Sequence, residues 1–391
     1  MFKSAVVTSE DVFTLGLGRR LGEELIGKMG QAPDACWVFC SPEKGIQAML
    51  EGINEAVGTR NMVGCTTDGE ISSIGLTTGS VVLGGIASDQ LQFQVAVVEG
   101  LGAKSETAGR KLAQGFGQDV RYVQLFSDGL TGNGCALLRG MAAILGPELP
   151  ISGGTAGDHG KFKQTWQFVG NRVLTDAAVA IGFSGQFQLG TGIRSGWTPI
   201  GLAKKVTRAS GNVLYELNGE SALNVLERFL GHHADKLPAI GVEYPLGLLG
   251  EWGDVGEDDY YLLRATMAVD RDEGSITFAG EIPEGAMVSL TCGDTDSILA
   301  ASEKAAQLAM ADLGEYEPAM IFCYSCMARK IVLGRLTQQE INRIRAVIGT
   351  SVPIIGFYTY GEYCRIQCEG PSVLHNETVT LSVLGDSACG E

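Results

Sequence analysis

The alternation of apolar and polar positions predicts strands and helices that follow one another along most of the chain. Short apolar runs at 37–41, 123–127 and 320–325 are typical of buried strands. Each run is followed by a stretch whose apolar residues lie three and four positions apart, which predicts an amphipathic helix. These predicted helices cover residues 45–57, 134–145 and 338–347.

The same order of elements occurs three times, which indicates an internal repeat. Each copy opens with a strand and a helix, continues with the strand and helix just described, and ends with a glycine-rich turn and a β-rich run. The opening pairs are 3–8 with 15–29, 91–98 with 106–116, and 286–292 with 296–313; the final runs are 80–86, 177–183 and 378–383. This alternation predicts an α/β fold of repeated strand-helix-strand-helix-strand units, whose sheets are covered by helices, in two domains.

One segment, from about 190 to 284, does not follow the repeat. It holds a predicted helix at 220–230 and a predicted strand at 260–269, and we interpret it as the join between two domains. The predicted N-terminal domain covers 1–220 and contains two repeat units. The predicted C-terminal domain covers 221–391 and contains one unit with the connecting segment.

The turns of the three copies can be aligned on a threonine, a glycine two positions later and then a carboxylate. The aligned residues are Thr67, Thr155 and Thr359; Gly69, Gly157 and Gly361; and Glu70, Asp158 and Glu362. Glycine lets the backbone approach a ligand closely, turn amides can hold an anion, and the acids can hold an ammonium group. The alternative is a tight turn that its acid caps. Three copies favour one shared site at the end of a sheet.

Nine segments, taken in order, resemble the FIST family, a two-part sensory module of prokaryotic signalling proteins. The N-terminal pattern is similar at 64–70, 126–129, 152–158 and 196–199, and the C-terminal pattern at 261–264, 282–285, 325–329, 356–362 and 374–378. The resemblance implies a sensor in signal transduction, with amino acids or related metabolites as proposed ligands. One stand-alone branch of the family binds haem and reports nitric oxide to a histidine kinase in a two-component system. The resemblance therefore implies a sensor histidine kinase or another signalling protein as partner.

The strand-end residues Ser127 and Asp128, with Ser41 and Ser325 at similar points, are candidates for polar lining of the site. A nucleophilic serine needs a base and an oxyanion hole, and no Gly-x-Ser-x-Gly elbow surrounds any of these serines. With no complete catalytic set, we expect a binding protein and not an enzyme.

Two arginines and two aromatic residues in the family-like segments are further candidates for ligand binding. Arg264 and Arg329 can hold a carboxylate in two-point contacts, or can form structural ion pairs in a chain with 45 acids. Trp197 and Tyr358 can stack on a planar ligand, or can pack in the core.

Haem needs an axial ligand, most often histidine. His159 follows the second turn directly, and His375 precedes the last β-rich run. These two histidines are the candidate iron ligands. His375 can instead be a structural histidine that pairs with Glu377 or with a backbone carbonyl.

The ten cysteines are expected to be free thiols in a reducing compartment. Cys323 and Cys326 form a single Cys-x-x-Cys, for which Cys364 and Cys368 are the candidate further zinc ligands. The alternative is burial as small apolar side chains. Because a nearby cation lowers a thiol pKa, Cys326 beside Arg329 is the nucleophile of the alternative reading, a thiol-dependent or hydrolytic enzyme.

The composition limits the classes of partner that are expected. The net charge of −16 repels phosphate backbones and anionic lipid, so neither nucleic acid nor a membrane is expected to bind. The first ten residues do not resemble a signal peptide, and there is no window of 18 apolar residues. We therefore expect a cytoplasmic protein that binds a small molecule. The oligomeric state stays open, a homo-oligomer included.

Overall fold

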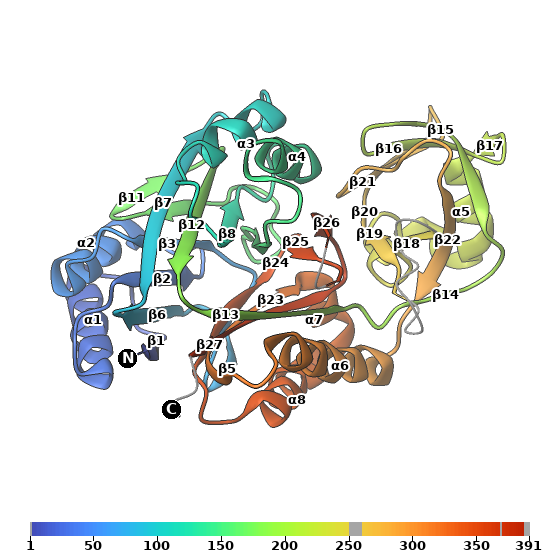
Figure 1. Ribbon diagram of the computed structural model, residues 1–391. Coiled ribbons are helices and arrows are strands. Elements are labelled where there is room, and N and C mark those ends of the chain that lie inside the picture. Colours follow the sequence, from blue (N-terminus) through green and yellow to red (C-terminus); the bar gives the residue numbers. More distant parts are fainter. Residues whose placement is uncertain (1, 250–259, 368–369, 387–391) are drawn as a thin grey trace.

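The computed structural model describes residues 2–249, 260–367 and 370–386. Three mixed sheets with helices on their outer sides form a body, and a fourth sheet with helix α5 stands beside it (Figure 1). The predicted α/β class is therefore confirmed. Within the described ranges, no helix is both long enough and apolar enough to cross a bilayer.

The body consists of three units with the same order of elements. The first unit contains β1 (Phe2–Ser9), α1 (Leu15–Met29), β2 (Ala35–Cys40), α2 (Ile46–Val57), β3 (Met62–Thr66), β4 (Glu70–Ser72), β5 (Gly75–Thr77) and β6 (Val81–Ser88). The second contains β7 (Leu91–Glu99), α3 (Ser105–Ala113), β8 (Tyr122–Ser127), α4 (Gly134–Leu145), β9 (Ile151–Thr155), β10 (Gln167–Val169), β11 (Arg172–Leu174) and β12 (Ala177–Gly185). The third contains β13 (Gln188–Arg194), α6 (Thr295–Leu313), β23 (Glu317–Cys326), α7 (Met327–Leu333), α8 (Thr337–Ile348), β24 (Ile354–Thr359), β25 (Glu362–Arg365), β26 (Ser372–His375) and β27 (Val379–Asp386).

Each sheet of the body is completed by a hairpin from another unit. The sheet β1-β6-β2-β3 continues into β10 and β11 of the second unit. The sheet β7-β12-β8-β9 continues into β25 and β26 of the third, and β13-β27-β23-β24 continues into β4 and β5 of the first. The donated hairpins form a closed exchange that covers one edge of every sheet. No unit completes its sheet from its own strands, so the three units are interlocked in one body.

The core of the body lies between the inner faces of its three sheets. The ring of Phe39 lies 5.3 Å from that of Phe126 in the second unit and 4.6 Å from that of Phe357 in the third. On the outside, helix pairs pack closely where glycines remove the side chain. A Cβ on Gly18 of α1, for example, would lie 2.0 Å from the Met49 carbonyl oxygen of α2. The helix pairs α1/α2, α3/α4 and α6/α8 lie around the outside of the body (Figure 1).

The fourth sheet is formed by the segment between β13 and α6. Its elements are β14 (Thr198–Pro199), β15 (Lys204–Ser210), β16 (Val213–Leu217), β17 (Glu220–Ser221), α5 (Ala222–Leu230), β18 (Leu246–Leu249), β19 (Leu262–Arg264), β20 (Thr266–Asp270), β21 (Ser275–Phe278) and β22 (Met287–Cys292). It contacts the body through the ion pair of Glu281 with Arg139 at 2.6 Å, and through a hydrogen bond from Arg264 to the Leu374 carbonyl.

The prediction that 286–292 opens the third repeat is wrong. That run is a strand, β22, but it lies in the fourth sheet, and the opening strand of the third unit is β13. β13 is the less apolar of the two strands, with Gln188, Thr191 and Arg194 among its seven residues, and its pairing with β27 places it in the third sheet. Gly190 and Gly192 of β13 leave room for α6, since a Cβ on either would lie within 2.1 Å of a carbonyl oxygen of that helix. The domain boundary at 220/221 stays a prediction, and the third sheet takes strands from both sides of it.

Candidate ligand-binding site

The three glycine-rich turns lie together at one end of the body. Backbone hydrogen bonds join the first turn to the third, the second to the first, and the third to the second. They run from Asp68 N to Tyr358 O, Tyr358 N to Gly69 O, Gly157 N to Thr66 O, and Thr155 N to Gly361 O, at 2.8–3.0 Å. We call this arrangement the turn ring. The repeated units therefore do bring their turns to one place.

Within the turn ring, Glu70 and Glu362 are buried and fully engaged with the protein. Glu70 accepts hydrogen bonds from the hydroxyls of Thr67, Ser41 and Ser80. Glu362 accepts from the hydroxyl of Thr359 and from that of Thr378 at 2.8 Å. Burial raises the pKa of both carboxyls to about 7, although these hydrogen bonds act in the opposite direction. Both acids tie a turn to neighbouring strands.

The alignment of Asp158 with these two acids is wrong. The pairing of the donated hairpins shows that Gln167 is the residue of the second unit that corresponds to the two glutamates. Glu70, Gln167 and Glu362 each pair with a residue of a neighbouring strand that directly follows a closely packed glycine. Those glycines are Gly356, Gly64 and Gly153, in the same order. Asp158 lies in a longer loop before β10, and the similarity of the turns ends where this loop begins.

Asp158 caps that loop. Its carboxylate accepts hydrogen bonds from the backbone amides of residues 162–164 and from the Tyr360 hydroxyl. Burial opposes the charged form, but these hydrogen bonds outweigh it and lower the pKa of Asp158. The capping alternative therefore describes the position of this acid.

A cleft of about 1280 Å³ lies between the turn ring and the fourth sheet. All three turns contribute to its wall, and so do the start of α7 and the strands β20 and β21. Among the lining residues are Asp68, Asp128, Thr155, His159, Cys326, Lys330, Tyr360, Asn376 and Glu377 from the body, and Thr266 and Phe278 from the fourth sheet. The carboxyl ends of the body's central strands therefore meet at a cavity that can take a small molecule.

Glu377 is the unusual residue of this cleft. Its side chain is fully buried, and neither carboxyl oxygen has a hydrogen-bond partner among the described residues. Burial, and after it the nearby charge of Glu362, raises the pKa of Glu377 well above its ordinary value. Two more buried atoms close by also lack partners in the described part of the chain, Nδ2 of Asn376 and Oδ1 of Asp68. Buried polar groups are rarely left unpaired, so this set makes the cleft the candidate binding site.

The backbone at Glu377 is also unusual. The same position in the repeat is occupied by Gly79 and Asp176, as the bonds between strands show, and all three residues have positive φ: 71°, 49° and 63° for Gly79, Asp176 and Glu377. A long side chain rarely adopts this conformation, which costs on the order of 1–3 kcal/mol. Backbone strain and a buried carboxyl without a partner among the described residues thus coincide at one residue of the cleft lining.

The sequence-predicted residues divide into two groups. Ser127, Asp128, Thr155 and His159 line the cleft. The lining does not include Thr67, Gly69, Glu70, Asp158, Trp197, Arg264, Arg329, Tyr358, Thr359, Glu362 or His375. The side chains that belong to the second group are buried against protein.

The two arginines are structural in this fold. Arg329 is fully buried, lies 2.7 Å from the Glu340 carboxylate, and also donates to the Ser302 hydroxyl and to backbone carbonyls. Arg264 donates to the backbone carbonyls of residues 263, 281 and 374. Both guanidinium groups therefore donate to acceptors of the protein itself, where the sequence predicted a ligand carboxylate.

The two aromatic candidates are also core residues. The Trp197 indole packs against Leu263 and Ile298 and donates to the Glu243 carbonyl at 3.3 Å. The Tyr358 hydroxyl donates to Glu340 at 2.5 Å. Neither ring lies in the wall of the cleft.

His375 does not fit the role of an iron ligand. Its Nδ1 lies 2.6 Å from the Tyr260 hydroxyl and its Nε2 lies 2.9 Å from the Cys364 carbonyl oxygen, so both ring nitrogens have protein partners. Burial lowers its pKa to about 3. The alternative of a structural histidine bonded to a backbone carbonyl is therefore confirmed.

His159 does reach the cleft, with its Nε2 2.9 Å from the Ser41 hydroxyl. Haem, however, carries two carboxylates of its own, and the unpaired groups nearest the cleft are mostly acidic. These acidic groups do not favour the haem carboxylates. No cluster of three or more histidine, cysteine or acidic residues suited to a metal occurs in the described ranges. Haem stays a prediction from the family resemblance.

Cys326 lies at the edge of the cleft and caps α7, with the amides of Ala328 and Glu377 close to its sulfur. Burial, and then the charges of Glu362 and Glu377, raise its pKa well above the ordinary value, so the thiol form is favoured. Cys323 and Cys364 are buried in strands, and Cys368 lies outside the described residues.

Comparison with known proteins gives matches across most of the chain. The FIST N domain matches residues 34–220 and the FIST C domain matches residues 222–365. An uncharacterized protein of Methanocaldococcus jannaschii is 24% identical over 81% of this chain and 64% of its own length. An uncharacterized protein of Mycobacterium tuberculosis is 25% identical over 61% of this chain and 62% of its own length. The chain thus spans less than two thirds of these relatives.

Among solved structures, a cyanuric acid hydrolase from A. caulinodans aligns with 99% of this chain and 100% of its own, at 10% identity and a TM-score of 0.36. A likeness at that level carries no argument about function. The two domain matches together cover 331 of the 391 residues, 187 in the first and 144 in the second. The chain belongs to the FIST family, with a FIST N domain followed by a FIST C domain.

Proposed function

We propose that this FIST sensory domain protein binds a small molecule in the cleft, and that the ligand presents a cationic group, such as a primary ammonium, to Glu377. The observation that carries the proposal is the pair of buried carboxyl oxygens without a partner in the described residues. A buried acid without a partner costs the folded state on the order of 1–3 kcal/mol, and a ligand cation would remove that cost.

The neighbours of Glu377 narrow the ligand further. The Asp68 oxygen without a partner adds a second acceptor for a cation, and the Asn376 amide adds a donor for a carbonyl or carboxylate. Lys330 is already bound to the other Asp68 oxygen at 2.6 Å. Acceptors and a donor in one cleft suit a zwitterion better than a plain anion. This supports amino acids or related metabolites over haem with nitric oxide, the other ligand that the family resemblance implies.

Sensing without catalysis is supported by the chemistry of the cleft. The Cys326 thiol is held in its protonated form, and the Ser127 hydroxyl is paired with the Tyr363 hydroxyl at 2.7 Å rather than with a base. The ligand would contact both the body and the fourth sheet, so its binding can change how the two are held together. We infer that a separate partner, a sensor histidine kinase or another signalling protein, reads that change.

A thermal-shift screen tests this proposal. The twenty amino acids, their N-acetyl derivatives and the matched carboxylic acids without an amine are added to the protein. We expect at least one free amino compound to raise the melting temperature, since a ligand stabilises the state that binds it. Its N-acetyl form and its deaminated form should have no effect, and the shift should vanish in Glu377→Gln. Equal shifts with and without the ammonium, or an unchanged shift in Glu377→Gln, would contradict the proposal.

A further inference from the structure

A second cavity lies inside the fourth-sheet domain, away from the cleft. We propose that it is a separate binding site for a small amphipathic carboxylate, whose apolar tail lies in the cavity and whose carboxylate meets Lys204 at the mouth. This proposal rests on observations independent of Glu377 and does not need the cleft to bind anything.

The cavity has a volume of about 290 Å³ and lies between α5 and the strands of the fourth sheet. Its wall is mostly aliphatic and aromatic, with Leu214, Leu226 and Phe278 as examples. These three side chains are also buried members of the domain's hydrophobic core. The hydrophobic core around α5 and the fourth sheet therefore surrounds a cavity.

A hollow of this size is unusual for a protein core. Interiors are packed as densely as organic crystals, with few voids larger than one water molecule. Since one water takes about 30 Å³ of liquid, this cavity corresponds to roughly ten waters. Waters in a mostly apolar cavity find few hydrogen-bond partners, whereas an alkyl chain or a ring would contact the whole wall. The cavity is thus better suited to an apolar group than to solvent.

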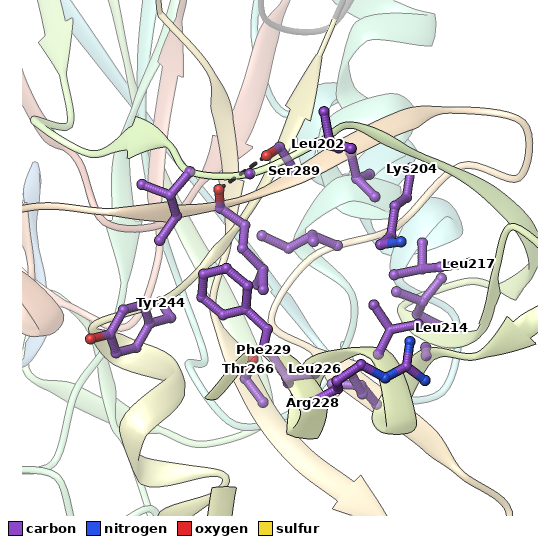
Figure 2. A pocket seen from close by; sticks show the side chains of 18 of the residues that line it. Leu202, Lys204, Leu214, Leu217, Leu226, Arg228, Phe229, Tyr244, Thr266 and Ser289 are labelled. Atoms are coloured by element: carbon purple, nitrogen blue, oxygen red, sulfur yellow. Dashed lines mark hydrogen bonds between the residues drawn. The ribbon is translucent and has the colours of Figure 1, made fainter. Parts of the chain in front are cut away.

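The charges at the mouth indicate which head group the ligand carries. Lys204 and Arg228 extend on the same side of the cavity, beside Leu214 and Leu217 (Figure 2). Arg228 forms an ion pair with Glu220, so the two cations and one acid leave one net positive charge. In a chain with a net charge of −16, a positive mouth on an apolar cavity favours a carboxylate with an apolar tail.

Exposed apolar side chains continue the cavity to the surface. Leu202 is 89% exposed and Phe229 is 45% exposed, and both line the cavity. Together with Lys204 they form a rim with one charged and two apolar members. Such a rim matches a molecule that has one charged end.

The cavity and the cleft share a wall. Thr266 of β20 and Phe278 of β21 line both. A ligand that fixes the position of these strands from one side changes the cost of binding on the other. Coupling of this kind is reciprocal, so each ligand would alter the affinity of the other by the same factor.

Calorimetric titration with octanoate tests the proposal, with octanol and octylammonium as probes of the same chain length. We expect saturable one-to-one binding of octanoate, with a negative heat-capacity change from apolar burial, and weaker binding of octylammonium. Lys204→Gln should weaken octanoate several-fold and leave octanol within twofold. Val225→Phe, which places a ring in the cavity, should weaken both at least tenfold.

Lys204 lies at the mouth, so its substitution keeps the test valid if Val225→Phe does not fold. Octanoate and octylammonium of equal affinity, or octanoate binding that Lys204→Gln does not change, would overturn the carboxylate assignment. Unaltered octanoate binding in a folded Val225→Phe protein would overturn the cavity as the site. None of these results depends on Glu377, so failure here is distinct from failure of the cleft proposal.

Discussion

The turn ring and the cleft above it contain the same chemical group in opposite situations. Glu362 and Glu377 are both fully buried in the third unit. Glu362 accepts hydrogen bonds from two threonine hydroxyls, whereas Glu377 accepts none among the described residues. The fold supplies hydrogen-bond donors to the first carboxyl, whereas the second carboxyl receives none from the described residues. The two acids therefore differ in whether the fold supplies a hydrogen-bond partner, and only Glu377 is proposed as a ligand contact.

One position of the repeat carries a different residue in each of the three units. Gly79 occupies it in the first unit and has no side chain to pair. Asp176 occupies it in the second unit, where its carboxylate accepts from the Gly102 amide at 2.7 Å and the Thr131 hydroxyl at 2.9 Å. Glu377 occupies it in the third unit and has no such partner in the described chain. What the units share maintains the fold, and the third unit departs from the others at the residue that we propose as the ligand contact.

The largest effect is expected at the buried pair of Arg329 in α7 and Glu340 in α8. Arg329→Met should lower the free energy of unfolding by about 3–5 kcal/mol, because Glu340 would be left buried without its cation. Urea denaturation measures this loss. Arg343→Met is the matched control, since Arg343 lies 3.8 Å from Glu303 in an exposed pair, and it should change stability by less than about 1 kcal/mol. Equal losses in the two variants would contradict the assignment.

The next effect concerns pH. The pKa of Glu70 and of Glu362 is raised from 4.5 to about 7 in the folded state. A raised pKa stabilises the fold below the unfolded value of 4.5, and this stabilisation is lost as the pH rises through about 7. Each carboxyl should therefore remove on the order of 3 kcal/mol between pH 4.5 and pH 9. Glu362→Gln should flatten its share of the slope in unfolding curves measured across this range.

A slope unchanged in Glu362→Gln would show that this acid does not titrate with a raised pKa. Glu315→Gln serves as the control, since Glu315 is exposed.

A smaller effect of opposite sign is expected at Glu377. Glu377→Gly should raise the free energy of unfolding by about 1 kcal/mol, because glycine adopts the positive φ without strain and the unpaired carboxyl is removed. Glycine already occupies this position in the first unit. Thermal unfolding of the two proteins without ligand tests the sign. A destabilised Glu377→Gly would mean that the side chain supports the fold.

Local patterns predicted much of the fold. Helices α1 and α4 have the predicted bounds, 15–29 and 134–145, because the amphipathic spacing and the signals for the helix ends are local in the sequence. Thr14 caps the first turn of α1, and Gly30 ends the helix in the left-handed conformation. The gathering of the three turns also follows from the repeat, since equivalent turns lie at equivalent ends of sheets.

The errors come from partners distant in the sequence. The run at 286–292 is a strand, as predicted, but it lies in another sheet than the predicted one, because its hydrogen-bonded neighbours lie far away in the chain. Asp158 resembles Glu70 in its local letters, but the hairpin pairing gives that place to Gln167. Glu377 lies in the family-like segment 374–378, where the sequence indicates it only as a partner of His375. That its carboxyl has no hydrogen bond to the described residues is a property of the packed structure that no local pattern records.

Whether Glu377 binds the ligand can be measured by calorimetric titration of the amine found in the thermal-shift screen, into the natural protein and into Glu377→Gln. We expect saturable binding to the natural protein and an affinity at least tenfold lower in Glu377→Gln, with the melting temperature of the free variant equal to or above that of the natural protein. Equal affinity in the two proteins would contradict it.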